Sequence, residues 1–276
     1  MQIKRNETLF NTRNEVINSL RTNVNIEDDD IILARYNGGS MLAVVKTVDE
    51  LRYFTIYDNI DRIEKIVGSL PSEFVINYNV KNMQSQTMFN NPDGGTYNGT
   101  QTFNNITNFY DDHITVNDGS SSSIVLSDIA SIISRNYSNP TLTVISKART
   151  TSTDGSLFAN RHSTYNWMYR QYKDRLTLHG TSQQGSISIT DNTKPSILSV
   201  TVDSDRNVVY TNHTEGTTST ANNFNYGDTN STDAALFWGF ADSFAEQWSG
   251  DFYWIFISTS KLSDNEIKKV IAYNES

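Results

Sequence analysis

The stretch Asp251-Phe252-Tyr253-Trp254-Ile255-Phe256-Ile257-Ser258, near the C-terminus, decides the fold of this chain. Successive side chains of a β-strand point to opposite faces. The stretch therefore predicts two apolar faces, one carrying Phe252, Trp254 and Phe256 and the other carrying Tyr253, Ile255 and Ile257. A strand that is apolar on both faces belongs in the middle of a sheet or between two layers. We expect this strand to be buried and central.

A short closing helix is predicted directly after this strand. Ser263 and Glu266 have the spacing of a capping box, in which two side chains satisfy free backbone N–H groups of the first helical turn. Leu262 before the cap and Ile267 after it have the spacing of a hydrophobic staple. The helix then carries one apolar stripe, formed by Ile267, Val270 and Ile271. The pattern indicates a core strand that leads into a packed C-terminal helix.

The composition favours strands and turns and excludes several classes of function. Of the 276 residues, 37% are apolar and 11% aromatic, and Asn, Thr and Ser carry much of the polar balance. With a formal net charge of −9, the chain lacks the basic face that a nucleic-acid-binding protein needs. The absence of cysteine excludes disulfides and thiolate metal sites. No apolar run is long enough for a membrane span or a signal peptide, so we expect an unprocessed chain without membrane insertion.

The chain is predicted to contain two parts, residues 1–70 and residues 71–276. The boundary is Leu70-Pro71-Ser72, because proline disfavours continuation of a helix and restricts the residue before it. After the boundary, short apolar runs alternate with polar turns, which is typical of an all-β sandwich. Residues 211–231 are polar and glycine-bearing, and we expect them to form a long surface loop.

Residues 1–70 are predicted to form a small α+β unit. Thr12 and Glu15 have capping-box spacing, and the turn sequence Asn37-Gly38-Gly39-Ser40 indicates a β-hairpin. The expected elements are helices at residues 12–20 and 58–67 and strands at residues 31–36, 41–48 and 53–57. Apolar stripes on both helices, at Val16, Ile17 and Leu20 and at Ile60, Ile63, Ile66 and Val67, indicate that a partner packs against them.

Several segments of residues 72–276 resemble a concanavalin A-like or laminin G-like domain. Thr141-Leu142-Thr143-Val144-Ile145-Ser146-Lys147-Ala148 is similar to an early strand of that family. Ser199-Val200-Thr201-Val202-Asp203, followed by Val208-Val209-Tyr210-Thr211-Asn212, is similar to a later hairpin. The Leu262-Ser263-Asp264-Asn265-Glu266-Ile267 helix start is similar to the family's closing helix. The resemblance implies a mainly β fold, a jelly-roll β-sandwich closed by a short α-helix.

The N-terminal unit resembles a different family. Ile31-Ile32-Leu33-Ala34-Arg35-Tyr36, before a glycine-bearing hairpin, is similar to the leading segment of virion proteins from crAss-like phages, among which head-fibre proteins fit a two-part chain best. That resemblance implies a capsid head fibre or decoration subunit that is assembled in the bacterial host cytoplasm and located on the virion. It also implies an N-terminal unit that attaches to other virion proteins and forms a homodimer or homotrimer.

No catalytic motif is found in the sequence. The chain has no Glu-x-Asp-x-Glu strand for glycoside hydrolysis and no Gly-x-Ser-x-Gly nucleophile elbow. The four histidines are scattered singly at His113, His162, His179 and His213, and each is predicted to be a surface residue or a satisfied polar residue. We therefore expect a protein that is not an enzyme.

Sugar sites combine an aromatic ring with Asn, Asp or backbone groups, and three loops have that composition, at residues 90–99, 222–228 and 242–250. The glycan-contact candidates are Tyr97, Asp93, Asn223, Tyr226 and Trp248. Each aromatic residue taken alone is more typical of a packing anchor, and Trp248 ranks first for exposure. Asp93 and Asp228 could hold a calcium ion, although their spacing does not require one; no other cofactor is expected.

Three hypotheses for the function follow. The first is a non-enzymatic virion fibre or decoration protein that projects a lectin-like domain toward host-surface glycans. The second is a free-standing carbohydrate-binding module, and the third is a polysaccharide depolymerase. The missing carboxylate pair argues against the third, and the small unit before the sandwich favours the first over the second.

Overall fold

The computed structural model divides the chain into two compact units, Met1–Val67 and Gly68–Ser276. It describes residues 3–10, 15, 31–36, 41–47, 50–56, 68–82, 95–97, 99–106, 108–119, 121–153, 155–161, 165–228, 232–237 and 247–276. The division between the units lies just before Leu70-Pro71-Ser72, the boundary that the sequence predicts.

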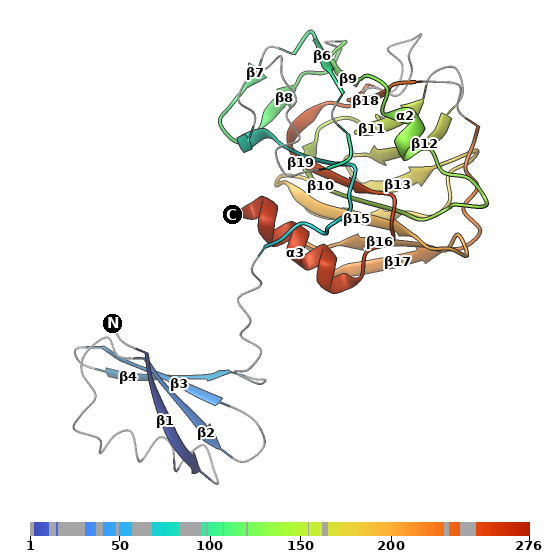
Figure 1. Ribbon diagram of the computed structural model, residues 1–276. Helices are drawn as coiled ribbons and strands as arrows, with labels where there is room; N and C mark the ends of the chain where they lie inside the picture. The colour runs from blue at the N-terminus through green and yellow to red at the C-terminus, as the bar shows by residue number, and fades with distance from the viewer. Residues whose placement is uncertain are drawn as a thin grey trace. The chain divides into compact units, whose positions relative to one another are not determined.

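The N-terminal unit contains a four-stranded sheet with the order β1-β2-β3-β4. The strands are β1 (Ile3–Phe10), β2 (Ile31–Tyr36), β3 (Met41–Thr47) and β4 (Glu50–Ile56) (Figure 1). The antiparallel pairing of β2 with β3 confirms the predicted hairpin, and β4 follows as its antiparallel neighbour. The sequence pattern does not predict β1, which runs parallel to β2, because five polar residues at positions 4–8 hide any apolar alternation.

The helices predicted in this unit, at residues 12–20 and 58–67, fall outside the described residues, apart from Glu15, which is helical. The two apolar stripes of those helices therefore stay predictions. None of the helices in the described part of the chain has the length and hydrophobicity needed to cross a membrane.

The C-terminal unit is a β-sandwich of two antiparallel sheets, which confirms the predicted fold class (Figure 1). The large sheet has the order β17-β16-β15-β10-β19-β8-β7, with β5 also paired to β19, and the small sheet has the order β14-β13-β12-β11-β18-β9-β6. The strands of the large sheet are β5 (Ile76–Asn79), β7 (Asn108–Phe109), β8 (Ile114–Val116), β10 (Leu142–Thr150), β15 (Ser196–Val202), β16 (Val208–Asn212), β17 (Thr217–Ala221) and β19 (Gly250–Ser258). Those of the small sheet are β6 (Gln101–Asn104), β9 (Ser123–Leu126), β11 (Phe158–Arg161), β12 (Tyr165–Gln171), β13 (Arg175–His179), β14 (Ile187–Ser188) and β18 (Ala234–Leu236). The described helices of this unit are η2 (Val80–Asn82), α2 (Ala130–Ile133) and α3 (Asp264–Glu275).

The main core lies between the two sheets. Val144 of β10 is fully buried in the same cluster as Trp167 and Tyr169 of β12. The Trp167 ring stacks on Phe158 of β11 with a centroid distance of 5.3 Å. A hydrogen bond of 3.0 Å joins the hydroxyls of Tyr169 and Ser146, so the two sheets are tied by a polar contact as well as by apolar packing.

Residues 217–221 form β17, at the edge of the large sheet, where the sequence predicts a surface loop. β17 pairs antiparallel with β16, from Val208 opposite Ala221 to Asn212 opposite Thr217. The segment has no apolar alternation, but the branched side chain of threonine suits an exposed edge strand. The loop prediction is therefore wrong for this part of residues 211–231.

β19 is the buried central strand that the sequence predicts. It pairs antiparallel with β10 on one side and with β8 and β5 on the other. Its side chains are apolar on both faces, and Trp254, Ile255 and Phe256 are almost completely buried. No other described strand contacts three neighbours in the large sheet, so β19 connects the sheet's two halves.

A β-bulge interrupts the alternation of β19. Trp254 lies opposite Lys147 but Phe252 lies opposite the next residue of β10, Ala148, so Tyr253 is the extra residue. Phe252 consequently joins the core between the sheets, in the cluster that contains Ile255. The predicted grouping of Phe252 with Trp254 is wrong, because a strict period of two does not hold across a bulge.

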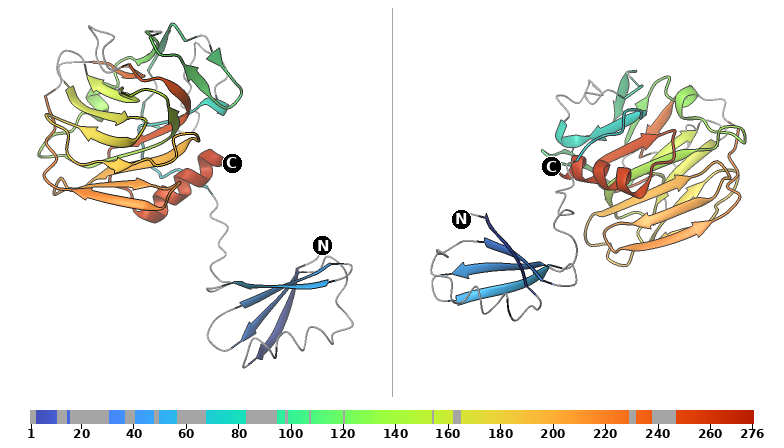
Figure 2. Two further views of the ribbon diagram at one scale, coloured as in Figure 1. Left: turned by 180° about the vertical axis from the view of Figure 1, so that it is seen from behind. Right: turned by 60° about the horizontal axis from the view of Figure 1, so that its bottom comes forward.

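α3 lies on the outer face of the large sheet (Figure 2), and a second apolar cluster lies under it. Its buried members are Phe74, Ile145, Trp254, Phe256, Leu262, Ile267 and Val270. The predicted capping box is confirmed, because Ser263 Oγ accepts from the Glu266 N–H at 3.4 Å and Glu266 Oε2 accepts from the Ser263 N–H at 2.8 Å. At the other end of the helix, Glu275 Oε1 accepts a hydrogen bond of 2.8 Å from Trp254 Nε1. Both ends of α3 are therefore fixed.

Truncation of Trp254 tests the place of β19 in the fold. Trp254→Ala should lower the free energy of unfolding by about 3–5 kcal/mol, because it leaves a cavity under α3 and removes the bond to Glu275. Trp254→Phe keeps most of the apolar contact and should cost clearly less. Guanidinium unfolding of the full chain measures both. An unchanged midpoint for the alanine variant would show that β19 is not a core strand.

Candidate functional site

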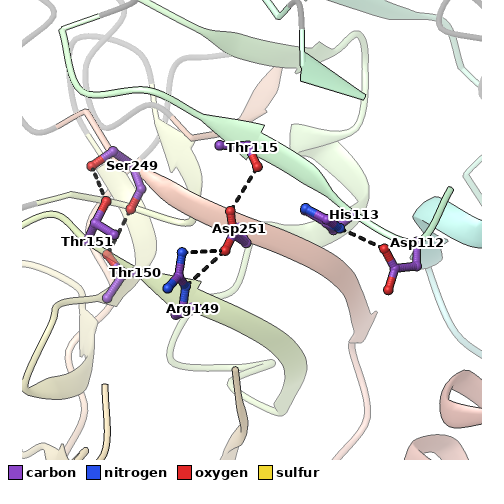
Figure 3. Close-up of polar contacts among 8 residues, drawn as sticks. All are labelled: Asp112, His113, Thr115, Arg149, Thr150, Thr151, Ser249 and Asp251. Atoms are coloured by element: carbon purple, nitrogen blue, oxygen red, sulfur yellow. Dashed lines mark hydrogen bonds and ion pairs between the residues drawn. The ribbon is translucent and has the colours of Figure 1, made fainter. Parts of the chain in front are cut away.

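A cluster of polar and aromatic side chains lies on the outer face of the large sheet, on β8, β10 and β19. Asp251 is its centre (Figure 3). One carboxylate oxygen accepts a hydrogen bond from Thr115 Oγ1 at 2.8 Å, and the other accepts from Arg149 Nε at 2.9 Å and pairs with Arg149 Nη2 at 2.7 Å. Two donor groups of one guanidinium on one carboxylate make a strong and directional contact. Asp251 thus joins three neighbouring strands at the surface.

Hydroxyl contacts continue this polar network at the start of β19. Thr150 Oγ1 donates to the Ser249 carbonyl oxygen at 3.1 Å, and the hydroxyls of Thr151 and Ser249 lie 3.2 Å apart (Figure 3). The Thr151 N–H donates to the same carbonyl at 2.9 Å. These contacts hold the end of β10 against the residues that lead into β19.

Three aromatic rings lie next to this network and form a stack. The Tyr110 ring lies on His113 with a centroid distance of 4.5 Å and an interplanar angle of 12°, and His113 lies on Tyr253 at 5.3 Å and 28°. We call these three residues the Tyr110 stack. Tyr253 belongs to β19, and the other two begin and end the turn between β7 and β8, which is closed by a bond of 2.9 Å from the Tyr110 N–H to the His113 carbonyl. The bulge in β19 is what brings Tyr253 to this face.

The Tyr110 stack has one end open to solvent. Tyr110 has 55% of its surface exposed, although its neighbour Phe109 packs toward the core against Phe103 at 5.6 Å. At the inner end, Lys147 Nζ lies 5.2 Å from the Tyr253 ring centroid and also pairs with Glu275 at 2.6 Å. One face of Tyr110 is therefore supported by His113, and more than half of the side chain is exposed to solvent.

The turn at the outer end of the stack carries two acidic side chains, Asp111 and Asp112. Asp112 Oδ1 lies 2.7 Å from His113 Nδ1, and the hydrogen bond from His113 holds the pKa of the Asp112 carboxyl below its usual value. Burial, together with the charges of Asp251 and Asp112, raises the pKa of the Tyr253 phenol. At neutral pH the site therefore presents a charged Asp112 carboxylate, which is a hydrogen-bond acceptor, and a neutral Tyr253 phenol.

The hydroxyl–histidine contact between Ser199 and His213 does not form an accessible nucleophile. Ser199 Oγ and His213 Nε2 lie 2.8 Å apart, which is the distance between a serine nucleophile and its base. Ser199 is only 2% exposed, however, so a substrate cannot reach its hydroxyl. Among the described residues, no three His, Cys, Asp or Glu side chains gather in a way that could hold a metal ion.

The aromatic residues predicted as glycan contacts are buried. Tyr97 donates a hydrogen bond to the Thr100 carbonyl oxygen at 2.9 Å, and Tyr226 donates to the Pro140 carbonyl oxygen at 2.6 Å. Trp248 is fully buried and stacks on Phe237 at 5.4 Å, so the prediction of an exposed Trp248 is wrong. The polar residues beside Trp248 indicated a surface loop, but their polar groups form hydrogen bonds inside the protein. Gln247 Oε1, for example, accepts from the Ser121 N–H at 2.9 Å.

The polar candidates lie at the surface or outside the described residues. Asn223 is exposed and adopts a left-handed backbone conformation with φ 59°. Asp93 and its neighbour Asn91 fall outside the described residues, and Asp228 is exposed. The structure thus brings none of the predicted aromatic candidates to the surface beside Asn223, and the calcium hypothesis for Asp93 and Asp228 stays a prediction.

The residues of the Tyr110 stack are not among the sequence candidates. Tyr110-Asp111-Asp112-His113, a polar turn with an aromatic ring at each end between two strands, is a local signal for them. Tyr253 belongs to the strand that the sequence predicts as wholly buried, and only the bulge and the pairing of β8 with β19 place it beside His113.

None of the known protein-family models matches this sequence, and none of the curated proteins does. Solved structures do show a similar arrangement of strands. The binding domain of botulinum neurotoxin DC in complex with rat synaptotagmin II has 11% identity and a TM-score of 0.47, over 75% of this chain and 52% of that one. Ruminococcus gnavus IT-sialidase CBM40 bound to alpha2,3 sialyllactose has 12% identity and a TM-score of 0.43, over 58% and 96%. The leech intramolecular trans-sialidase has 14% identity and a TM-score of 0.43, over 60% and 27%.

The match to the neurotoxin spans only 52% of that chain's length. At these identities and TM-scores, the similarity concerns the general β architecture. This similarity does not indicate which ligand this chain binds.

Asp251→Asn tests the network beneath the stack. The amide keeps an oxygen for Thr115 but loses the charge that pairs with Arg149, so we expect a loss of about 1–3 kcal/mol in the free energy of unfolding. Asp174→Asn is the matched control, because the ion pair of Asp174 with Arg175 is exposed, and it should change stability by less than about 0.5 kcal/mol. Equal effects of the two substitutions in urea unfolding would argue against a structural role for Asp251.

Proposed function

We propose that this chain is a non-enzymatic carbohydrate-binding protein whose β-sandwich holds a neutral sugar ring on the open face of Tyr110. The observation that carries the proposal is the Tyr110 stack. An exposed tyrosine that is supported by a second ring at 4.5 Å offers a flat apolar surface whose orientation is already fixed. A fixed side chain loses little conformational entropy when a ligand binds.

The surroundings of Tyr110 match the needs of a sugar. The C–H groups on one side of a pyranose ring pack against an aromatic face, while the hydroxyls at the ring's edge need hydrogen-bond acceptors and donors. Asp111 and Asp112, in the same turn, are exposed carboxylates that accept such bonds. Two carboxylates beside the ring would repel an acidic sugar, which favours a neutral ligand.

A binding role without catalysis is consistent with the chemistry of the described residues. The His113–Asp112 pair has an orientation suitable for a general base, but among the described residues no hydroxyl bonds to His113, and Ser199, which does bond to a histidine, is buried. The sequence carries no Glu-x-Asp-x-Glu pair for glycoside hydrolysis. These observations support a lectin-like role over that of a depolymerase.

The proposal also covers where the sandwich is located. The resemblance of Ile31–Tyr36 to crAss-like phage virion proteins supports a head-fibre or decoration subunit on the virion, in which the N-terminal unit attaches to the capsid. The separate N-terminal sheet is compatible with that attachment. The neutral-sugar site does not depend on it and serves equally in a free-standing carbohydrate-binding module.

A glycan array probed with the full chain tests the sugar site. We expect binding to glycans that end in a neutral sugar, and Tyr110→Ala should weaken that binding about tenfold or more, since truncating an aromatic contact at the centre of a site commonly costs ~2 kcal/mol. Tyr110→Phe keeps the ring and should retain most of the affinity.

Thermal unfolding of each variant provides the control, because Tyr110 is exposed and its truncation should leave the fold intact. A full chain that binds no neutral glycan, or a Tyr110→Ala variant that binds as well as the original, would refute the sugar site.

Light scattering tests the proposed role of the N-terminal unit. The full chain should be a homodimer or homotrimer, because projecting virion proteins assemble with closed symmetry and a unit of about 70 residues buries little of its own surface. Residues 72–276 alone should be monomeric. A monomeric full chain at tens of micromolar, or an oligomeric fragment, would contradict the assembly through residues 1–70.

A further inference from the structure

A second exposed tyrosine lies apart from the Tyr110 stack, in the turn that follows α2. Tyr137 has 60% of its surface exposed, and together with Tyr110 it makes up the exposed large apolar side chains of the described residues. The turn is fixed by Asn136, whose Oδ1 accepts from the N–H groups of Ser138 and Asn139 at 2.9 Å each. Tyr137 is therefore held outward by a rigid turn.

Two other loops meet at Tyr137. Its hydroxyl donates a hydrogen bond to Asn225 Oδ1, and the guanidinium carbon of Arg206 lies 4.7 Å from its ring centroid. Arg206 belongs to the β15–β16 turn, and its carbonyl oxygen accepts from the Phe224 N–H at 2.9 Å. Phe224 is buried against Tyr226 at 4.8 Å, so the loop that carries Asn225 is anchored in the core.

The polar groups of this cluster still have unused donors. Within the described residues, Arg206 makes no ion pair, its side-chain N–H groups have no hydrogen-bond acceptor, and Asn225 Nδ2 donates to no protein atom. The neighbouring Asp203 is occupied, because its oxygens accept from the Asp205 and Asn207 N–H groups at 3.0 and 2.8 Å and pair with Lys261 at 3.6 Å. A half-buried guanidinium with free donors is well suited to a carboxylate.

We propose that Arg206, Tyr137 and Asn225 form a second binding site, which takes a sugar that bears a carboxylate. Arg206 donates two N–H groups to the carboxylate oxygens. The Tyr137 ring packs against the sugar ring, and Asn225 Nδ2 donates to a hydroxyl. The sugar is held at three points that the fold already fixes relative to one another.

This site differs in charge from the Tyr110 stack. At the Tyr110 stack, the exposed Asp111 and Asp112 oppose an acidic ligand, whereas Tyr137 has a guanidinium on its ring. The exposed Asp205 next to Arg206 weakens the attraction, although salt and solvent screen a charge at the surface. The second site does not rest on the neutral-sugar site, and either can fail without the other.

Calorimetric titration of the full chain carrying Tyr110→Ala, which removes the neutral-sugar site, tests the second site with a matched pair of ligands, a galacturonic acid trisaccharide and the same trisaccharide with its carboxyl groups reduced to alcohols. We expect the acidic trisaccharide to bind and the neutral one to bind at least about tenfold more weakly at the Tyr137 site, as is typical of the loss of a charge-assisted hydrogen bond. Arg206→Gln and Tyr137→Ala should each weaken the acidic trisaccharide about tenfold or more. Lys194→Gln removes another exposed positive charge and should not affect binding.

Acetate and inorganic phosphate, titrated as competitors, separate a sugar site from a general anion site. Failure of both anions to compete at the concentration of the trisaccharide supports the proposal. Equal competition, equal affinity for the two trisaccharides, or unchanged affinity in both the Arg206→Gln and Tyr137→Ala variants would overturn it. Because the neutral-glycan array reports on Tyr110, its outcome is independent of this one.

Discussion

The structure depends on one constraint, the burial of β19 on both of its faces. Its inner face joins the core between the sheets through Phe252, Ile255 and Ile257, and its outer face carries Trp254 and Phe256 under α3. A single extra residue, Tyr253, makes this division possible by shifting the alternation. The same bulge exposes part of the strand beside α3 and so provides the inner end of the Tyr110 stack. Packing and surface chemistry are therefore set by one short segment.

Much of the sandwich could be predicted from the sequence, because local signals determine it. The apolar run of β19 and the capping box at Ser263 required no knowledge of distant residues. The bulge at Tyr253 could not be predicted, since it depends on which residue of β10 lies opposite. The edge strand β17 was hidden by its threonines, whose preference for a strand appears only when β16 lies beside it.

The candidate sites show why composition alone misplaces a binding surface. Tyr97, Tyr226 and Trp248 lie in polar loops, yet each ring is directed into the core and its loop is polar only on the outside. These buried rings also hold nearby surface residues in fixed positions. Phe224 and Tyr226 anchor the loop that presents Asn225, and Phe109 anchors the turn that presents Tyr110. In both places a buried ring fixes a neighbouring polar or aromatic side chain at the surface.

The arrangement of the Tyr110 stack has a consequence for how such a protein could change its ligand over generations. Tyr253 is fixed by its strand, but Tyr110, Asp111, Asp112 and His113 belong to a single turn whose backbone is closed by one hydrogen bond. Replacements in that turn would alter the shape and charge of the proposed sugar site and leave the hydrophobic interior untouched. Substitutions in this turn can therefore adapt the proposed site to a different sugar without preventing the chain from folding.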